Sequence, residues 1–147
     1  MTLDGESESL ALGRALAKVA RPGDMIALSG PLGAGKTSIA RGLLAELGLA
    51  GEAPSPSFAI VQPYDPPEVA FPVLHVDLYR IEEAGEAEEL GLDDARIDSL
   101  LVVEWPERLG EQWLADALWL TLSVMDSGAR RLTARVPAAW RNRWPLT

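Results

Sequence analysis

The octapeptide Gly30-Pro31-Leu32-Gly33-Ala34-Gly35-Lys36-Thr37 decides the fold of this 147-residue chain. It matches the pattern G-x-x-x-x-G-K-[ST] at every fixed position, after an apolar stretch and before a stretch of helix-forming residues. Glycines let backbone N–H groups approach phosphate oxygens, the lysine reaches the β- and γ-phosphates, and the threonine hydroxyl can bind Mg²⁺. The motif therefore predicts a loop that cradles a nucleoside triphosphate. The residues expected to bind the nucleotide here are Gly30, Gly33, Ala34, Gly35, Lys36, Thr37 and Ser38.

On both sides of this loop, the apolar pattern predicts strands that alternate with helices. A β-hairpin is expected near the C-terminus, with 117–124 paired to 130–136 around a turn at 126–128. This order indicates a single α/β domain over 1–147, a P-loop NTPase with a mainly parallel central sheet flanked by helices and a C-terminal antiparallel hairpin. The motifs lie within about 6–136, and 137–147 is expected to be a short tail. The expected strands are 24–29, 57–62, 73–79 and 100–104, and the expected helices are 10–21, 36–47 and 82–92.

Two of the predicted strands end in acidic residues, Asp77 and Glu104. Ligands of open α/β sheets bind at the carboxyl ends of the strands, so both carboxylates are candidates for holding Mg²⁺ or activating water. Each could instead be an ordinary strand-end acid, and Glu104 could cap a helix that begins near Pro106. His75 alternates onto the same strand face as Asp77, and we expect it to be a structural hydrogen-bonding residue rather than a catalytic base.

Three further features near the loop allow two interpretations each. Ser55 and Ser57 could form a switch that senses the third phosphate, or simply a proline-stiffened turn. Trp105 could stack on a base, although core packing is the expected role on pattern alone. The acidic stretch 82–98 could be a solvated helix face or a docking surface for a basic partner.

Composition limits the classes of function. The formal net charge of −9 argues against unaided binding of nucleic acid, despite a possible local patch of Arg130, Arg131 and Arg135. If nucleic acid is involved, a partner is expected to hold it. The chain has no cysteine and one histidine, which excludes thiolate chemistry and a multi-histidine metal site. Its start is acidic and polar, unlike a secretory signal, and we expect a cytoplasmic, membrane-free and monomeric protein.

Four stretches stand in order along the chain: 30–37, Ser-Pro-Ser-Phe at 55–58, His-Val-Asp-Leu-Tyr-Arg at 75–80 and Val-Glu-Trp-Pro at 103–106. Together they resemble the bacterial TsaE family, ATPases of threonylcarbamoyladenosine biosynthesis. The resemblance implies an ATPase needed to form threonylcarbamoyladenosine at position 37 of tRNAs that read ANN codons. It also implies association with a TsaD–TsaB type transferase pair, which brings the tRNA, and ATP and Mg²⁺ as ligands.

The resemblance also implies roles for single residues. Lys36, Asp77 and Glu104 would be catalytic, and Thr37 would hold Mg²⁺ together with Glu104 or Asp77. Trp105 would lie against the nucleotide. Glu6, Ser9 and Gly128 would also lie on the nucleotide side, and Ser55 and Ser57 would form the switch. Two positions depart from the family pattern: Ser57 replaces a common threonine, and Pro31 removes one possible backbone donor from the loop.

Slow intrinsic hydrolysis is expected, because the sequence shows no arginine finger and an arginine supplied by a partner can accelerate P-loop hydrolysis by roughly 10³–10⁵. Two alternatives remain open. One is a small-molecule or nucleoside kinase, although the acidic stretch 82–98 disfavours an anionic acceptor. The other is a non-hydrolysing switch in which ATP binding alone controls assembly.

Overall fold

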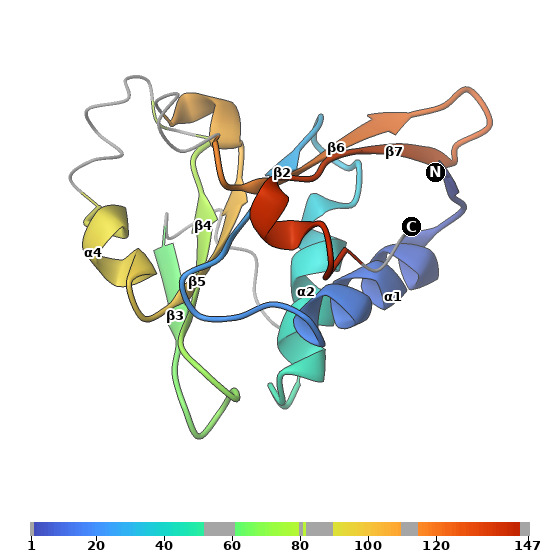
Figure 1. The fold of residues 1–147 in the computed structure, drawn as a ribbon. Helices are drawn as coiled ribbons and strands as arrows, with labels where there is room; N and C mark the ends of the chain where they lie inside the picture. The colour runs from blue at the N-terminus through green and yellow to red at the C-terminus, as the bar shows by residue number, and fades with distance from the viewer. Residues whose placement is uncertain (1, 52–60, 80, 82–89, 110–114, 145–147) are drawn as a thin grey trace.

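The computed structural model describes residues 2–51, 61–79, 81, 90–109 and 115–144. Within them, the strands form one sheet of order β1-β7-β6-β2-β5-β4-β3 (Figure 1). The strands are β1 (Thr2–Leu3), β2 (Met25–Ser29), β3 (Val61–Tyr64), β4 (Val73–Asp77), β5 (Leu100–Glu104), β6 (Leu118–Val124) and β7 (Arg130–Arg135). The helices are α1 (Glu6–Ala17), α2 (Lys36–Glu46) and α4 (Leu92–Arg96), with 3₁₀ turns η1 (Pro106–Arg108) and η3 (Ala138–Trp140).

The central strands run parallel. β2 pairs in parallel with both β5 and β6, and β5 pairs in parallel with β4, whereas β3, β7 and β1 add antiparallel edges. The predicted α/β class, the mainly parallel core and the C-terminal hairpin β6–β7 are therefore confirmed. The two-residue strand β1 was not expected, because so short a segment carries no periodic signal.

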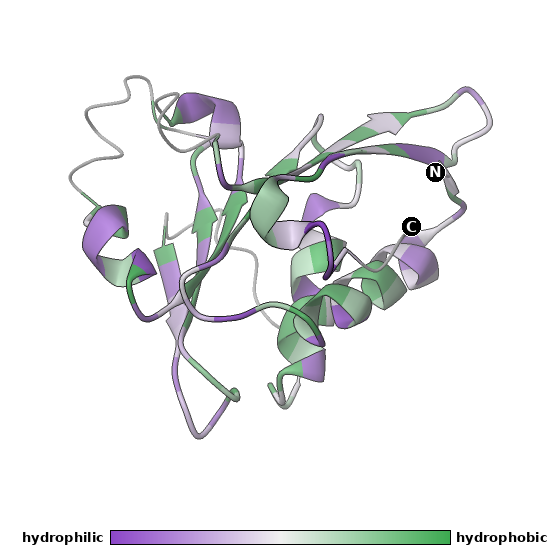
Figure 2. Ribbon diagram, viewed as in Figure 1, coloured by the Kyte–Doolittle hydropathy of each residue, from purple (hydrophilic) through white to green (hydrophobic). Residues whose placement is uncertain are grey.

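Alternating side chains of the strands divide the core into two layers. Ile26 and Leu28 point toward α1 and α2, while Met25 and Ala27 belong to a second cluster that includes Leu92 of α4. Figure 2 shows hydrophobic residues concentrated on the central strands and on α1 and α2. This two-sided burial explains the nearly continuous apolar runs of β2 and β5.

Helices α1 and α2 lie side by side on one face of the sheet and touch at their backbones (Figure 1). A Cβ atom at Gly13 would lie 2.0 Å from the Ile39 carbonyl oxygen, and one at Gly42 would lie 2.1 Å from the Leu10 carbonyl oxygen. No side chain fits at either position, so these two glycines set the spacing between the helices. That spacing in turn places the start of α1 beside the start of α2.

Some predicted boundaries differ from the observed ones. Most of the strand expected at 57–62 lies outside the described residues. Within them, β3 runs from Val61 to Tyr64 and includes Pro63, which an edge strand tolerates. The strand expected at 73–79 ends at Asp77. Most of the helix expected at 82–92 lies outside the described residues; of its described end, 90–91 form a turn and Leu92 is the first residue of α4.

The described part of the expected tail packs against the domain. The Trp140 side chain is fully buried in the same cluster as α1 and α2. Arg143 donates to both carboxylate oxygens of Asp24, at 2.6 and 3.0 Å. The segment therefore closes the core beside the start of β2. Among the described helices, none has both the length and the apolar character needed to cross a bilayer.

Candidate nucleotide-binding site

The loop from Gly30 to Gly35 joins the carboxyl end of β2 to the first turn of α2. Gly30 and Gly35 have positive φ angles of 142° and 107°, and a Cβ at Gly30 would lie 2.5 Å from the Leu122 carbonyl oxygen. Only glycine accommodates this combination of backbone conformation and close approach. Among the described residues, no side chain caps the start of α2, so its first N–H groups are available to an anion. Pro31 still contributes to the loop, because its carbonyl accepts from the Ala34 N–H at 3.2 Å.

Lys36 is held inside the loop. Its side chain is buried, and Nζ donates to the Gly30 carbonyl at 2.5 Å and lies 3.7 Å from the centre of the Trp105 ring. Burial lowers the pKa of Lys36, and the negative charges of Glu104, Asp77 and Glu107 oppose that shift. A buried ammonium with one carbonyl partner and an aromatic face gains from a phosphate anion, which would replace the water it has lost.

Glu104 meets two side chains from other elements. The Thr37 hydroxyl donates to its carboxylate, at 3.0 Å from Oε1 and 3.2 Å from Oε2, and His75 Nε2 donates to Oε2 at 2.6 Å. The register explains this meeting: Glu104 shares the α2-facing side of β5 with Val102, which pairs with His75. His75 is fully buried, and its Nδ1 has no hydrogen-bond partner among the described residues. Its observed contact is thus the structural hydrogen bond expected from the sequence.

Asp77 ends β4 directly beside Glu104, its register partner on β5. Its Oδ1 accepts from the Tyr79 N–H at 2.9 Å. Burial raises the pKa of Asp77; the Tyr79 N–H opposes the shift, and the nearby Glu104 charge reinforces it. Two buried carboxylates next to one hydroxyl form a set of hard oxygens, the donor type that Mg²⁺ prefers.

Trp105 adopts a left-handed backbone conformation, with φ 61°, which is uncommon for a bulky residue. Its ring packs against Tyr79, with centroids 5.1 Å apart, and against the ammonium of Lys36. Strained backbone of this kind persists where the surroundings over-determine it, often at functional sites. The side chain therefore lies at the site, half-buried, as well as contacting the second core cluster.

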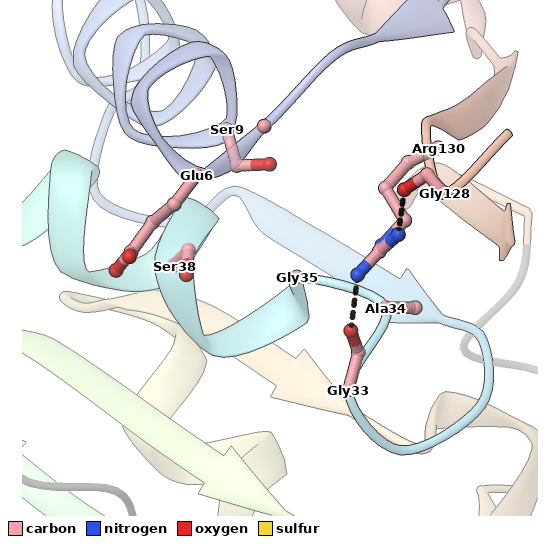
Figure 3. A pocket seen from close by; sticks show the side chains of 9 residues that line it. Glu6, Ser9, Gly33, Ala34, Gly35, Ser38, Gly128 and Arg130 are labelled. Carbon is pink, nitrogen blue, oxygen red and sulfur yellow. Dashed lines mark hydrogen bonds between the residues drawn. The ribbon is translucent and has the colours of Figure 1, made fainter.

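Two cavities flank the loop. The phosphate-side cavity, of about 210 Å³, is lined by Lys36, Thr37, Asp77, Glu104 and Trp105. The hairpin-side cavity, of about 310 Å³, lies between the start of α1, the loop and the β6–β7 turn (Figure 3). Both cavities share Gly33, Gly35 and Ser38, so they form the two ends of one groove over the loop.

The groove brings together nearly all the described residues proposed from the sequence. The hairpin-side cavity is lined by Glu6, Ser9, Ala34 and Gly128. Gly30 accepts the hydrogen bond from the Lys36 ammonium. Ser55 and Ser57 lie outside the described residues, so the switch stays a prediction.

The sequence reasoning missed Arg130, which was considered only for a basic patch. Its Nη2 donates to the Gly33 carbonyl at 3.1 Å, and its Nη1 donates to the Gly128 carbonyl. No local pattern could have shown this, because Gly33 and Arg130 are 97 positions apart. The sequence reasoning expected a structural hydrogen bond for His75 but did not identify Glu104 as its partner, which strand alternation together with the sheet order would have predicted.

Comparison with known proteins gives one consistent family. A family model described as threonylcarbamoyl adenosine biosynthesis protein TsaE matches residues 3–132. The chain is 45% identical over 112 residues to the tRNA threonylcarbamoyladenosine biosynthesis protein TsaE of Streptomyces coelicolor, covering 76% of each chain. It is 34% identical over 127 residues to the Bacillus subtilis protein of the same name, covering 86% of this chain and 78% of the other. The crystal structure of Bacillus subtilis YdiB is similar, with a TM-score of 0.78, 26% identity and coverage of 97% and 87%.

Proposed function

The chain belongs to the TsaE family of threonylcarbamoyl adenosine biosynthesis proteins, and on that premise we propose that it is a Mg²⁺-dependent ATPase. Its hydrolysis of ATP supports formation of threonylcarbamoyladenosine at position 37 of tRNAs that read ANN codons. It acts with a TsaD–TsaB type transferase pair and does not itself transfer the threonylcarbamoyl group. The tRNA is held by these partners, in keeping with the net charge of −9 on this chain.

The observation that carries this proposal is the convergence of Lys36, Thr37 and Glu104 on one cavity beside a glycine-rich loop. In the nucleotide complex, Lys36 exchanges the Gly30 carbonyl for phosphate oxygens and neutralises their charge. The uncapped start of α2 adds backbone donors to the same anion. Without a bound anion, the Lys36 ammonium is buried and the first N–H groups of α2 lack acceptors among the described residues. A phosphate group satisfies both, so phosphate is the ligand that the loop fits.

The oxygen donors next to this loop suit Mg²⁺. Thr37, with Glu104 or Asp77, would hold the ion, which neutralises charge on the phosphates. The described residues contain no group of three or more His, Cys, Asp or Glu side chains placed to hold a metal by themselves. Mg²⁺ in nucleotide sites takes one or two carboxylates and completes its shell with phosphate oxygens and water.

Glu104 is the residue best placed to act on the attacking water. Hydrogen bonds from Thr37 and His75 orient its carboxylate at the edge of the phosphate-side cavity. Lys36 is the only cation among the described residues that line this cavity. Hydrolysis is therefore slow in the isolated protein and rises when a partner supplies further positive charge.

Release of inorganic phosphate from ATP·Mg²⁺ tests the proposal, measured for the protein alone and with its TsaD–TsaB pair. The Glu104→Gln variant should lower the rate by roughly 10²- to 10⁴-fold, the usual size of a general-base effect. Glu46→Gln, an exposed carboxylate at the far end of α2, is the matched control and should hydrolyse ATP normally.

Three outcomes would contradict the proposal. Equal rates of ATP hydrolysis with and without the partners would show that the partners do not stimulate hydrolysis. Transfer of the phosphoryl group to a metabolite without free phosphate would indicate a kinase. Undiminished tRNA modification by a Glu104→Gln protein that no longer hydrolyses ATP would indicate a switch that needs binding alone.

A further inference from the structure

The hairpin-side cavity is the end of the groove that receives the nucleoside. The phosphate-side cavity contains the ammonium, the hydroxyl and both buried carboxylates, so the triphosphate belongs there. The two cavities meet over Gly33, Gly35 and Ser38. A nucleotide whose phosphates lie in the loop must therefore extend its sugar and base toward the start of α1 and the β6–β7 turn.

The walls of this cavity offer few side chains that could hold a base. Most of its described lining consists of glycines and small residues, and none of these described residues has an aromatic ring. Glu6 is exposed, whereas Ser9 is buried, with its hydroxyl close to Gly35. Arg130 is the only described cation in this lining, and its guanidinium is the one planar group there with a π face.

The hydrogen bonds of Arg130 determine how it can act. They run to the carbonyls of Gly128 and Gly33, from the hairpin turn to the loop (Figure 3). N–H bonds of a guanidinium lie in its plane, so these two contacts use its edge rather than its flat faces. The carbonyls also hold the group still, which lowers the entropy that a ligand contact would cost.

We propose that Arg130 binds the nucleoside half of the nucleotide, with its guanidinium stacked on the base and its edge tied to Gly33 and Gly128. This inference rests on the proposed nucleotide-binding function and extends it to base recognition. A cation over an aromatic ring contributes a modest but measurable affinity. Arg130 thereby makes the protein bind a nucleotide more tightly than inorganic polyphosphate. The loop alone cannot make this distinction, because it contacts only the phosphates.

Affinities for ATP, ADP and inorganic tripolyphosphate, measured by calorimetry on the full chain, test this proposal. Arg130→Ala should weaken ATP and ADP binding by roughly 3- to 30-fold and leave tripolyphosphate affinity unchanged. Arg130→Lys should weaken ATP nearly as much, because lysine keeps the charge but lacks the planar face. Arg131→Ala, an exposed arginine on the same strand, makes the same change in charge and should leave all three affinities unchanged. In the hydrolysis assay, Arg130→Ala should raise the KM for ATP by a similar factor.

Unchanged ATP affinity in Arg130→Ala would overturn the proposal. Equal losses for ATP and tripolyphosphate would overturn it as well, because Arg130 would then act on the loop or the phosphates. Full ATP affinity in Arg130→Lys would show that charge alone suffices, against stacking. Thermal melts without ligand establish that each variant folds. If Arg130→Ala does not fold, the affinities of Arg130→Lys test the proposal. A wild-type protein that binds no ATP would instead remove the proposed function, so the two failures are distinguishable.

Discussion

Replacing Gly13 by alanine tests whether the contact between α1 and α2 positions the site. Helix propensity alone favours this change, because alanine in a helix interior is more stable than glycine by about 0.8–1 kcal/mol. Packing opposes it. The new Cβ would lie 2.0 Å from the Ile39 carbonyl oxygen and 2.7 Å from the Leu43 nitrogen, both backbone atoms of α2. A carbon and an oxygen in weak contact normally lie about 3.3–3.6 Å apart, so the helices must separate by more than 1 Å.

The expected effect is a net loss of stability. Overpacking of this kind costs about 1–3 kcal/mol, and a contact with rigid backbone belongs at the upper end. After the propensity gain, about 1–2 kcal/mol of destabilisation remains. For a chain of this size, that lowers Tm by roughly 2–8 °C. Separation of the helices also moves Ser9 away from Gly35, so nucleotide affinity should fall together with stability.

Thermal and urea unfolding of the nucleotide-free protein measure the effect, and calorimetry with ADP measures the affinity. Ala11→Gly is the matched control, because Ala11 is an exposed position in the same helix. It exchanges the same two residue types in the opposite direction and should cost about 1 kcal/mol by propensity alone. A Gly13→Ala protein that is more stable than the wild type, by the amount that Ala11→Gly loses, would refute the argument from helix contact.

Other predictions concern the site itself. ATP or ADP at about 100 times its Kd should stabilise the protein by about 2.7 kcal/mol and raise Tm by roughly 5–11 °C. Lys36→Ala should abolish this shift in a thermal-shift assay, and a full shift in the variant would disprove the role of the loop. His75→Leu removes the donor to Glu104 and should lower hydrolysis at saturating ATP by roughly 10- to 100-fold without changing ADP affinity, whereas His75→Gln, which keeps an amide N–H, should recover most of the rate. Burial raises the pKa of Asp77, so the folded protein favours the protonated carboxyl over the carboxylate. The stability that this protonated carboxyl contributes is fully present below the unfolded pKa of about 3.9. It is lost as pH rises through the higher pKa of the folded protein. Asp77→Asn should therefore raise Tm of the nucleotide-free protein near pH 7 and not below about pH 3.9; an equal difference at both pH values would contradict this cause.

Features set by neighbouring residues were predictable from the sequence by itself. The loop at 30–37, the buried strand at 100–104 and the hairpin turn near 126–128 all formed where expected. Their causes are local: glycine permits positive φ, a run of apolar residues suits a strand buried on both faces, and a short glycine-containing turn closes a hairpin. The alternation of strands and helices along the chain likewise predicted the class of fold. The positions of the motifs at the ends of predicted strands predicted which edge of the sheet carries the site.

Only the tertiary structure decided which distant residues meet. Glu104 contacts His75 because β4 and β5 are neighbours in register, and Arg130 reaches Gly33 because β6 lies beside β2. The contact of Gly13 with α2 likewise depends on two helices sharing one face of the sheet. Periodicity reports which face of an element is buried but not what covers that face, because sheet order and helix spacing come from packing across the whole chain.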